Sequence, residues 1–338
     1  MTPRRPALWA GALALTLLAA CSPEPPPQPP APGASMTFTN PVYDANFPDP
    51  GVIRAGSTWY AYGTNGPIGN VPYLTSPDLV TWTEGGDALP GLGPWAEPGN
   101  TWAPEVVALP GGGYALYYTA RSTEAGLQCV GVAVSDRPEG PFVDRSDRPL
   151  ICEADEGGSI DASPFLDEDG TLYLYWKNDG NHIGEPTHLY GRRLTPDGLK
   201  LTGERVRLLT NTAPWHKHVI EAPQMVRHDG RLYLFYSAGA FDSDEYAAGY
   251  ATCEGPLGPC ADAAENPILR STARAAGPGH SFLVTTPGGE TWLLYHAWPP
   301  DAVGSVEPGR LLWMDRVDWV DGKPIVRGPT HTPQKRPA

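Results

Sequence analysis

Short runs rich in aromatic residues recur five times along this 338-residue chain at a nearly constant spacing. They occupy residues 59–62, 114–118, 172–176, 232–236 and 292–296, and the spacing between the last four is 58 to 60 residues. Each run follows a shorter apolar stretch, and Asp-Gly or Gly-Gly turns join the two stretches in the last three units, as in β-hairpins. Self-similarity at a fixed period of this length indicates a repeat architecture.

Five such units of four short strands, with almost no helical periodicity, predict an all-β fold, a five-bladed β-propeller that forms a single domain. We expect residues Phe38 to Tyr43 to join the last blade and close the ring, because closure leaves no long sheet edge exposed.

The first 35 residues have the pattern of an export signal and a tether. Arg4 and Arg5 precede an apolar stretch too short to span a bilayer, and Leu18-Ala19-Ala20-Cys21 resembles a bacterial lipobox. We therefore expect a lipoprotein signal peptide at 1–20, a lipidated Cys21 with a proline-rich tether at 21–35, and the propeller at 36–338. The alternative is an ordinary signal peptide with an incidental cysteine. Both place the protein outside the cytoplasm, the former as a bacterial lipoprotein anchored to the cell envelope.

The composition limits which molecules the protein is expected to bind. The formal net charge of −14 argues against nucleic acid and anionic lipid, so we expect contact with the membrane only through the lipid anchor. An even number of cysteines after Cys21 in an exported chain suggests disulfides, which we pair as nearest neighbours, Cys129–Cys152 and Cys253–Cys260; four free thiols are the alternative. We expect a monomer.

Polar residues stand at matching places before the central runs of four units. Asp49, Asp161, Glu221 and His280 each lie eleven residues before Tyr60, Leu172, Leu232 and Thr291, and the second unit has Trp102-Ala103-Pro104-Glu105 at this place. Because the innermost strands of a propeller begin around one axis, these side chains should meet in space. Charges gathered in this way cost free energy and are typical of functional sites.

In these segments the chain resembles glycoside hydrolase family 43. The matching motifs run in order through residues 40–324 and comprise Asn40-Pro41, Pro48-Asp49-Pro50, Ser76 to Trp82, Trp102 to Glu105, Ile160 to Ser163, Ile220 to Pro223 and Gly277 to His280. Ala162 and Ala222 stand where the family commonly has proline and glycine, which blurs the subfamily.

The resemblance implies a catalytic role for three carboxyl groups. Asp49 matches the family's general base and Glu221 its general acid, while Asp161 matches the carboxylate that raises the acid's pKa and orients it. Such an arrangement hydrolyses a glycosidic bond with inversion, without a cofactor. Turn residues and a paired surface charge are the alternatives for the three residues taken singly.

The resemblance also suggests substrate contacts. Phe47 and Trp102 are candidate aromatic platforms, Arg310 matches an arginine that reaches the sugar, and His280 is either a substrate contact, a structural histidine or a ligand of an axial Ca²⁺ ion. Five further residues are expected along the cleft: Trp215, His216, Tyr246, His296 and Trp298.

These features predict an inverting hydrolase of α-L-arabinofuranosyl linkages in arabinan or arabinoxylan, acting on plant cell-wall polysaccharides or oligosaccharides. A β-xylosidase on the same scaffold is the nearest alternative. A non-catalytic sugar-binding lipoprotein is the alternative of another class, although it would not need all three carboxylates.

Overall fold

The computed structural model describes Met1 and residues 36–338. The predicted signal peptide 1–20, the lipidated Cys21 and the tether lie outside the described residues. In the part of the chain that the structure describes, no helix is long and apolar enough to cross a membrane.

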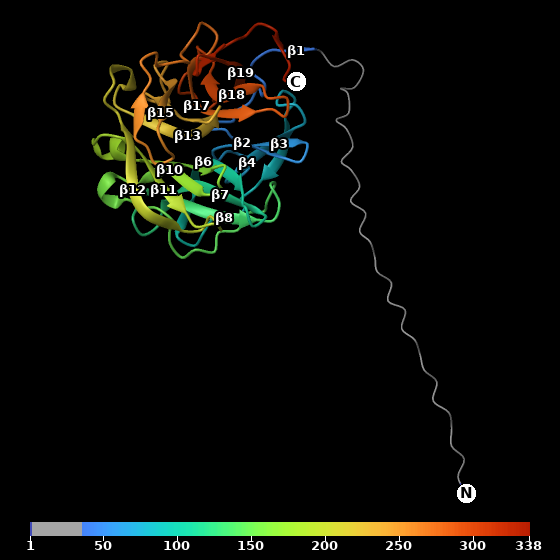
Figure 1. Ribbon diagram of the computed structural model, residues 1–338, viewed down its shortest axis with the longest axis vertical. Coiled ribbons are helices and arrows are strands. Elements are labelled where there is room, and N and C mark those ends of the chain that lie inside the picture. The colour runs from blue at the N-terminus through green and yellow to red at the C-terminus, as the bar shows by residue number, and fades with distance from the viewer. Residues whose placement is uncertain (2–35) are drawn as a thin grey trace. The chain divides into compact units, whose positions relative to one another are not determined.

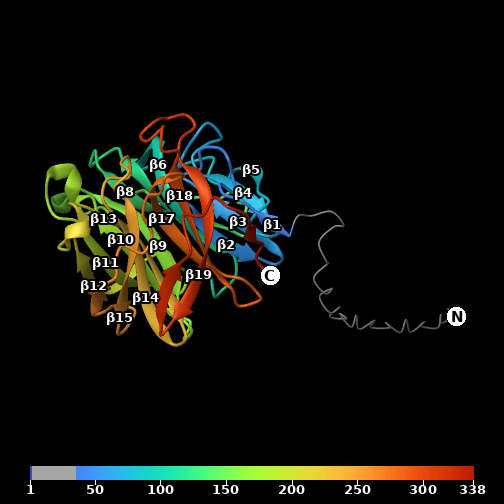
Figure 2. The same cartoon turned by 90° about the horizontal axis from the view of Figure 1, so that it is seen from above.

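Five antiparallel sheets follow one another around a ring, so that the colour in Figure 1 changes in order around the molecule, and Figure 2 shows the same sheets from above. Blade 1 contains β2 (Gly51–Ala55), β3 (Thr58–Tyr62), β4 (Pro72–Ser76) and β5 (Thr83–Asp87). Blade 2 contains β6 (Ala96–Ala108), β7 (Tyr114–Ser122) and β8 (Gln128–Ser135). Blade 3 contains β9 (Ser159–Leu166), β10 (Leu172–Asn178), β11 (His188–Leu194) and β12 (Leu201–Thr210).

Blade 4 contains β13 (Ile220–His228), β14 (Arg231–Ala238), β15 (Ala247–Cys253) and β16 (Cys260–Asp262). Blade 5 contains β17 (Ala276–Thr285), β18 (Thr291–Trp298), β19 (Leu311–Val320) and β20 (Lys323–Val326). Three short 3-10 helices lie in loops of the described residues: η1 (Ala154–Glu156), η2 (Gly180–Ile183) and η3 (Pro214–His216). The predicted five-bladed propeller is therefore confirmed.

Both ends of the described unit contribute to ring closure. Strand β1 (Thr37–Phe38) pairs with β21 (Gln334–Lys335) near the C-terminus (Figure 1). The backbone N–H of Val42 then donates to Leu312 O in β19 at 2.8 Å, and Tyr43 forms a bridge to the same residue. The prediction for this segment was thus correct for its second half, whereas Phe38 pairs with β21 rather than with the last blade.

One blade departs from the predicted four strands. Blade 2 has three strands in the described residues, and only an isolated bridge between Val134 and Val143 occupies the position of a fourth. The segment after β8 contains Pro138 and Pro141, and proline cannot donate to a sheet ladder. A long outer strand is therefore disfavoured there.

The aromatic runs form the second strand of every blade. Each of these strands packs with its two faces against the neighbouring blades. All eight residues of β18 and all seven of β10 are buried, because each strand is covered on both faces. Leu174 and Trp176 of β10, for example, share one apolar cluster with Tyr117 of β7. This explains why the runs lack the alternation of a half-exposed strand.

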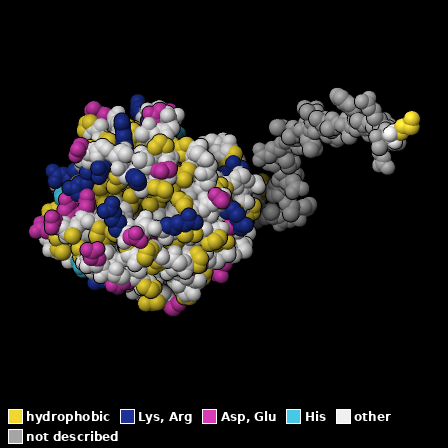
Figure 3. All heavy atoms as spheres, turned by 90° about the horizontal axis from the view of Figure 1, so that it is seen from below, with side chains coloured by type: hydrophobic (Ala, Val, Ile, Leu, Met, Phe, Trp, Pro, Cys, Tyr) yellow, Lys and Arg dark blue, Asp and Glu magenta, His cyan; other side chains and the backbone are white. Residues whose placement is uncertain are grey.

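Both predicted disulfides are present and confirm the pairing. Cys129 of β8 bonds to Cys152, and Cys253 of β15 bonds to Cys260, its register partner in β16. The two disulfides therefore crosslink segments in the outer parts of blades 2 and 4. Charged side chains of both signs mix with apolar ones on the face in Figure 3, as expected for an ordinary surface.

Candidate active site

A backbone irregularity recurs where each blade begins near the axis. One residue per blade has a left-handed φ: Asp49 (57°), Ala103 (44°), Asp161 (56°), Ala222 (54°) and His280 (44°). In blades 2 to 5 the strand register shifts at this residue, which marks a β-bulge. Such φ values are uncommon outside glycine and cluster at functional sites. We call these five residues the bulge ring.

The bulge ring is held by a circle of hydrogen bonds between blades. Each ring residue donates its backbone N–H to a side chain of the preceding blade. The five bonds are Asp49 to His296 Nδ1 (3.2 Å), Ala103 to Thr64 Oγ1 (2.9 Å), Asp161 to Thr119 Oγ1 (3.2 Å), Ala222 to Asp161 Oδ2 (3.0 Å) and His280 to Ser237 Oγ (2.8 Å). Buried N–H groups that leave the sheet ladder are satisfied in this way.

The positions of the bulges change the alignment of blade 4 with the other blades that the sequence predicted. Counting eleven residues back placed Glu221 level with Asp161, but in the structure Ala222 is the ring residue of blade 4. Glu221 lies one position earlier, level with Trp102 in blade 2. Two adjacent positions where the blades begin therefore supply the three carboxylates, Trp102 and His280.

These two positions line a pocket of about 380 Å³ at the axis, within the usual size range of ligand sites. The structure brings together the three predicted carboxylates with Trp102, His280 and Arg310. The lining also includes residues that the sequence analysis did not single out: Thr64, Ile160, Lys177, Asp179, Asn181, His182 and Phe241.

Asp49 is nearly enclosed by polar side chains. Arg310 Nη1 lies 2.6 Å from Oδ1, and the Thr64 hydroxyl donates to Oδ2 at 2.6 Å. Nδ1 of His280 and of His296 each lie 3.3 Å from Oδ1. Burial alone would raise the pKa of Asp49, but Arg310 and the two histidines outweigh it and hold this pKa well below its usual value. Asp49 is therefore ionised.

His296 is neutral. Its Nδ1 accepts the N–H of Asp49, which leaves the ring proton on Nε2. Burial, followed by the charge of Arg310, lowers the pKa of His296 to about 3. His296 therefore supports the backbone of Asp49 instead of acting as a proton donor.

Glu221 and Asp161 line the same pocket. The Tyr246 hydroxyl donates to Glu221 Oε1 at 2.8 Å, and Lys177 Nζ donates to Glu221 Oε2 at 3.1 Å. Burial, and then the nearby charge of Glu221, raises the pKa of Asp161 to about 6 despite His280 and Lys177. Asp161 therefore retains its proton to a higher pH than Asp49 does.

A fourth carboxyl lies deeper. Glu105, from the Trp102–Glu105 motif, is buried and does not line the pocket, and burial raises its pKa well above the usual value. A side chain at Gly51 would meet Glu105 Cγ at 2.9 Å and Pro104 O at 2.6 Å, so the glycine is required for this close approach. Glu105 thus packs behind the site.

Several predicted contacts take other places. Phe47 is only 1% exposed and packs edge-on against Tyr43 in the core, so the expected sugar platform at Phe47 is corrected. Trp215 and His216 pack with Tyr236 in blade 4, away from the pocket lining. Tyr246, His296 and Trp298 are buried and stand behind the lining.

Phe241 is a platform that the sequence analysis missed. It follows β14, is 47% exposed and lines the pocket, and the Arg310 guanidinium lies 5.0 Å from its ring centre. Its only signal in the sequence is an aromatic residue in a Gly-Ala-Phe-Asp loop.

The residues around His280 do not fit calcium. Among the described residues no three carboxylates, histidines or cysteines form a metal-binding group, and the carboxylate beside His280 is already paired with Arg310. Calcium requires six to eight oxygen ligands. We derive no step through a metal.

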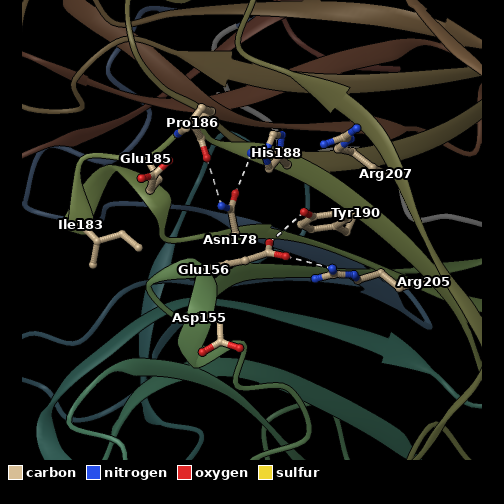
Figure 4. A pocket seen from close by; sticks show the side chains of 10 residues that line it. All are labelled: Asp155, Glu156, Asn178, Ile183, Glu185, Pro186, His188, Tyr190, Arg205 and Arg207. Carbon is tan, nitrogen blue, oxygen red and sulfur yellow. Dashed lines mark hydrogen bonds and ion pairs between the residues drawn. The ribbon is translucent and has the colours of Figure 1, made fainter.

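A second cavity of about 560 Å³ lies between η1, η2 and the outer strands of blade 3 (Figure 4). Its side chains mostly bind one another: Asn178 bonds to Pro186 O and His188 N, and Glu156 accepts from Tyr190 and Arg205. These contacts hold the loops in place, and we therefore assign the chemistry to the pocket at the bulge ring.

Comparison with known proteins agrees with this geometry. The sequence model of "Glycosyl hydrolases family 43" matches residues 38–324. A β-D-galactofuranosidase of Aspergillus niger is 26% identical, with 76% of this chain and 75% of that protein covered. A xylosidase/arabinosidase of Humicola insolens is 30% identical, with coverages of 70% and 77%. Other relatives are named extracellular endo-arabinanase and exo-arabinofuranosidase.

Among solved structures, a thermostable family-43 glycoside hydrolase superposes with a TM-score of 0.81 at 32% identity, covering 89% of this chain and 99% of that one. The family model spans nearly the whole propeller, including every segment of the pocket. The chain therefore belongs to glycoside hydrolase family 43 and is a glycosidase.

Proposed function

We propose that the protein is an inverting hydrolase of α-L-arabinofuranosyl linkages in arabinan or arabinoxylan. Asp49 is the general base that takes a proton from the attacking water. Glu221 is the general acid that protonates the leaving oxygen, and Asp161 keeps a proton available to it. Inversion requires one carboxylate and one carboxylic acid on opposite sides of the sugar.

One observation carries this proposal: a single pocket holds Asp49 paired with the Arg310 guanidinium and, apart from that cation, Asp161 with Glu221. Asp49 has a pKa well below its usual value, while that of Asp161 is raised to about 6. Between these limits Asp49 is ionised while Asp161, beside Glu221, still holds a proton, which supports acid–base cleavage. A module that only bound sugar would have no use for this difference.

The other lining residues support sugar recognition. Trp102 and Phe241 expose aromatic rings to the pocket, and Arg310 combines contact with Asp49 and a place in the lining. Apolar sugar faces stack on such rings, and the guanidinium can donate to a sugar hydroxyl. We propose these three, with His280, as substrate contacts.

A β-xylosidase remains the second candidate, because one relative is named for both xylosidase and arabinosidase activity. The two disulfides and the relatives named extracellular support a location outside the cytoplasm. We further propose that Cys21 is lipidated, that residues 21–35 tether the enzyme to the envelope, and that it acts as a monomer. Mass spectrometry of the membrane fraction tests the lipid, and light scattering tests the oligomeric state.

The test of activity compares the wild type with Glu221→Gln on nitrophenyl α-L-arabinofuranoside, nitrophenyl β-D-xyloside, linear arabinan and arabinoxylan. Loss of the general acid should lower the rate on the polysaccharide about 10²–10⁴-fold. Glu185→Gln, at an exposed carboxylate, is the matched control. Proton NMR of the first sugar released reports inversion. Equal rates for the wild type and Glu221→Gln would refute the acid role, and faster xyloside cleavage would favour the second candidate.

A further inference from the structure

Blade 3 differs from the other blades at one position of its second strand. In blades 2, 4 and 5 the residue opposite the start of the bulge accepts the N–H of the next ring residue; these acceptors are Thr119, Ser237 and His296. The same position of blade 3, opposite Ile160, is Lys177. An ammonium group has no acceptor, so Lys177 cannot take part in the circle of hydrogen bonds.

Asp161 replaces the missing acceptor. Its Oδ2 accepts the N–H of Ala222, the bond that a second-strand side chain makes in the other blades. Lys177 is thereby released from the circle, and its Nζ lies 3.1 Å from Glu221 Oε2 and 3.6 Å from Asp179 Oδ1. Only 1% of the Lys177 side chain is exposed. Burying an ammonium in this way is costly unless it is paired.

We propose that Lys177 is a positioning residue that fixes the Glu221 carboxyl by charge and hydrogen bonding and sets the upper pH limit of activity. This inference rests on the proposed role of Glu221 as the general acid. The retained proton of the Asp161–Glu221 pair is the one that the leaving group needs, so a cation beside the pair makes this proton leave at a lower pH.

The charges around the pair give the direction of the effect. Lys177 faces it from β10, His280 from β17, Tyr246 from the loop before β15, and Asp49 from the segment before β2. Tyr246 stays neutral, because burial and then Glu221 raise its pKa well above the usual value. Glu221 and Asp49 raise the pKa of Asp161, whereas His280 and Lys177 lower it.

Lys177 itself stays charged. Burial would lower its pKa, but the carboxylates of Glu221, Asp179 and Asp161 outweigh burial and raise it. Asp179 therefore has two effects on the pair: it stabilises the Lys177 charge and partly offsets it. Removing Asp179 should leave the pair facing a stronger cation, while removing Lys177 should leave it facing none on that side.

The test measures kcat/KM against pH for the wild type, Lys177→Met, Lys177→Arg and Asp179→Asn on arabino-oligosaccharides, whose leaving alcohol needs a general acid. Lys177→Met should move the alkaline limb upward by about one to three pH units, the range for an opposite charge at this distance. Asp179→Asn should move it downward, and Lys177→Arg should keep it near the wild-type position. A lower kcat in Lys177→Met with an unmoved alkaline limb would show that Lys177 has a purely structural role, and it would overturn the proposal.

A second measurement needs no substrate. NMR titration of ¹³C-labelled Glu and Asp carboxyl carbons, with Glu221→Gln to assign the signal, follows the pair directly. A higher titration midpoint in Lys177→Met supports the proposal, and an unchanged midpoint overturns it. If the wild type cleaves none of the glycosides, the proposed function fails while this titration still decides the effect of Lys177. If Lys177→Met does not fold, the downward shift in Asp179→Asn decides it.

Discussion

Removing the positive charge of Arg310 should raise the pKa of Asp49, the proposed general base. Arg310 Nη1 lies 2.6 Å from Asp49 Oδ1, and the two side chains are only 12% and 11% exposed. Coulomb's law gives about 6 kcal/mol for this contact at an effective dielectric constant of about 20. Opposite charges in proteins shift a carboxyl pKa by about one to three units, or roughly 1.4–4 kcal/mol. We expect the smaller pKa shift of one to three units, because the Thr64 hydroxyl still donates to Asp49 and stabilises its charge in an Arg310→Met variant.

The assay is kcat/KM for nitrophenyl arabinofuranoside across the acidic range in the wild type, Arg310→Met and Arg310→Lys. The wild-type acid limb should lie below the usual Asp value of 3.8, since the base must be ionised to act. In Arg310→Met this limb should rise by about one to three pH units, while Arg310→Lys retains most of the wild-type position. Lost sugar contact would lower activity at every pH without moving the limb. A limb that stays in place in Arg310→Met would refute this account of Asp49.

Three further results are expected. Wild-type activity should fall as the pH rises through about 6, because the raised pKa of Asp161 marks loss of the retained proton; a pH–rate profile that is flat up to mildly alkaline pH would contradict this. Thr119→Val removes the acceptor of the buried Asp161 N–H and should cost about 1–3 kcal/mol in urea unfolding, whereas Thr119→Ser should cost much less; equal losses would show that the hydroxyl is not the cause. Phe241→Ala should raise KM on arabino-oligosaccharides with kcat little changed, and an unaltered KM would exclude the ring as a platform.

The fold could be predicted from the sequence because its strongest pattern has one physical cause. The second strands are buried on both faces, so the aromatic runs recur wherever a blade recurs. The same repeat placed Asp49, Asp161, Glu221 and His280 at one axis, and the structure gathers them in one pocket. Disulfide pairing by nearest neighbours also held, since Cys253 and Cys260 end adjacent strands of one hairpin.

Other features depended on contacts that a linear pattern does not contain. A bulge adds a residue without any marker in the sequence, so counting from the central strand placed Glu221 one position out of register. The bond from Asp49 to His296 joins residues 247 positions apart. Phe47 was taken for a surface platform because the closure of blade 5 over it cannot be seen from its neighbours. Nothing in the sequence marks Lys177, a single charge that follows the aromatic run of β10, as a residue of the site.

The distribution of cations explains how one small pocket keeps carboxyls in different protonation states. Four carboxyls line it, Asp49, Asp161, Asp179 and Glu221, against two permanent cations, Arg310 and Lys177. Asp49 has the Arg310 guanidinium, whereas Lys177 is shared among the other three. Full ionisation would leave the second group with two uncompensated negative charges in a buried site, and retaining a proton relieves this repulsion. The assignment of base and acid therefore follows from which carboxyl receives the guanidinium, and moving that charge should be more damaging than removing either histidine.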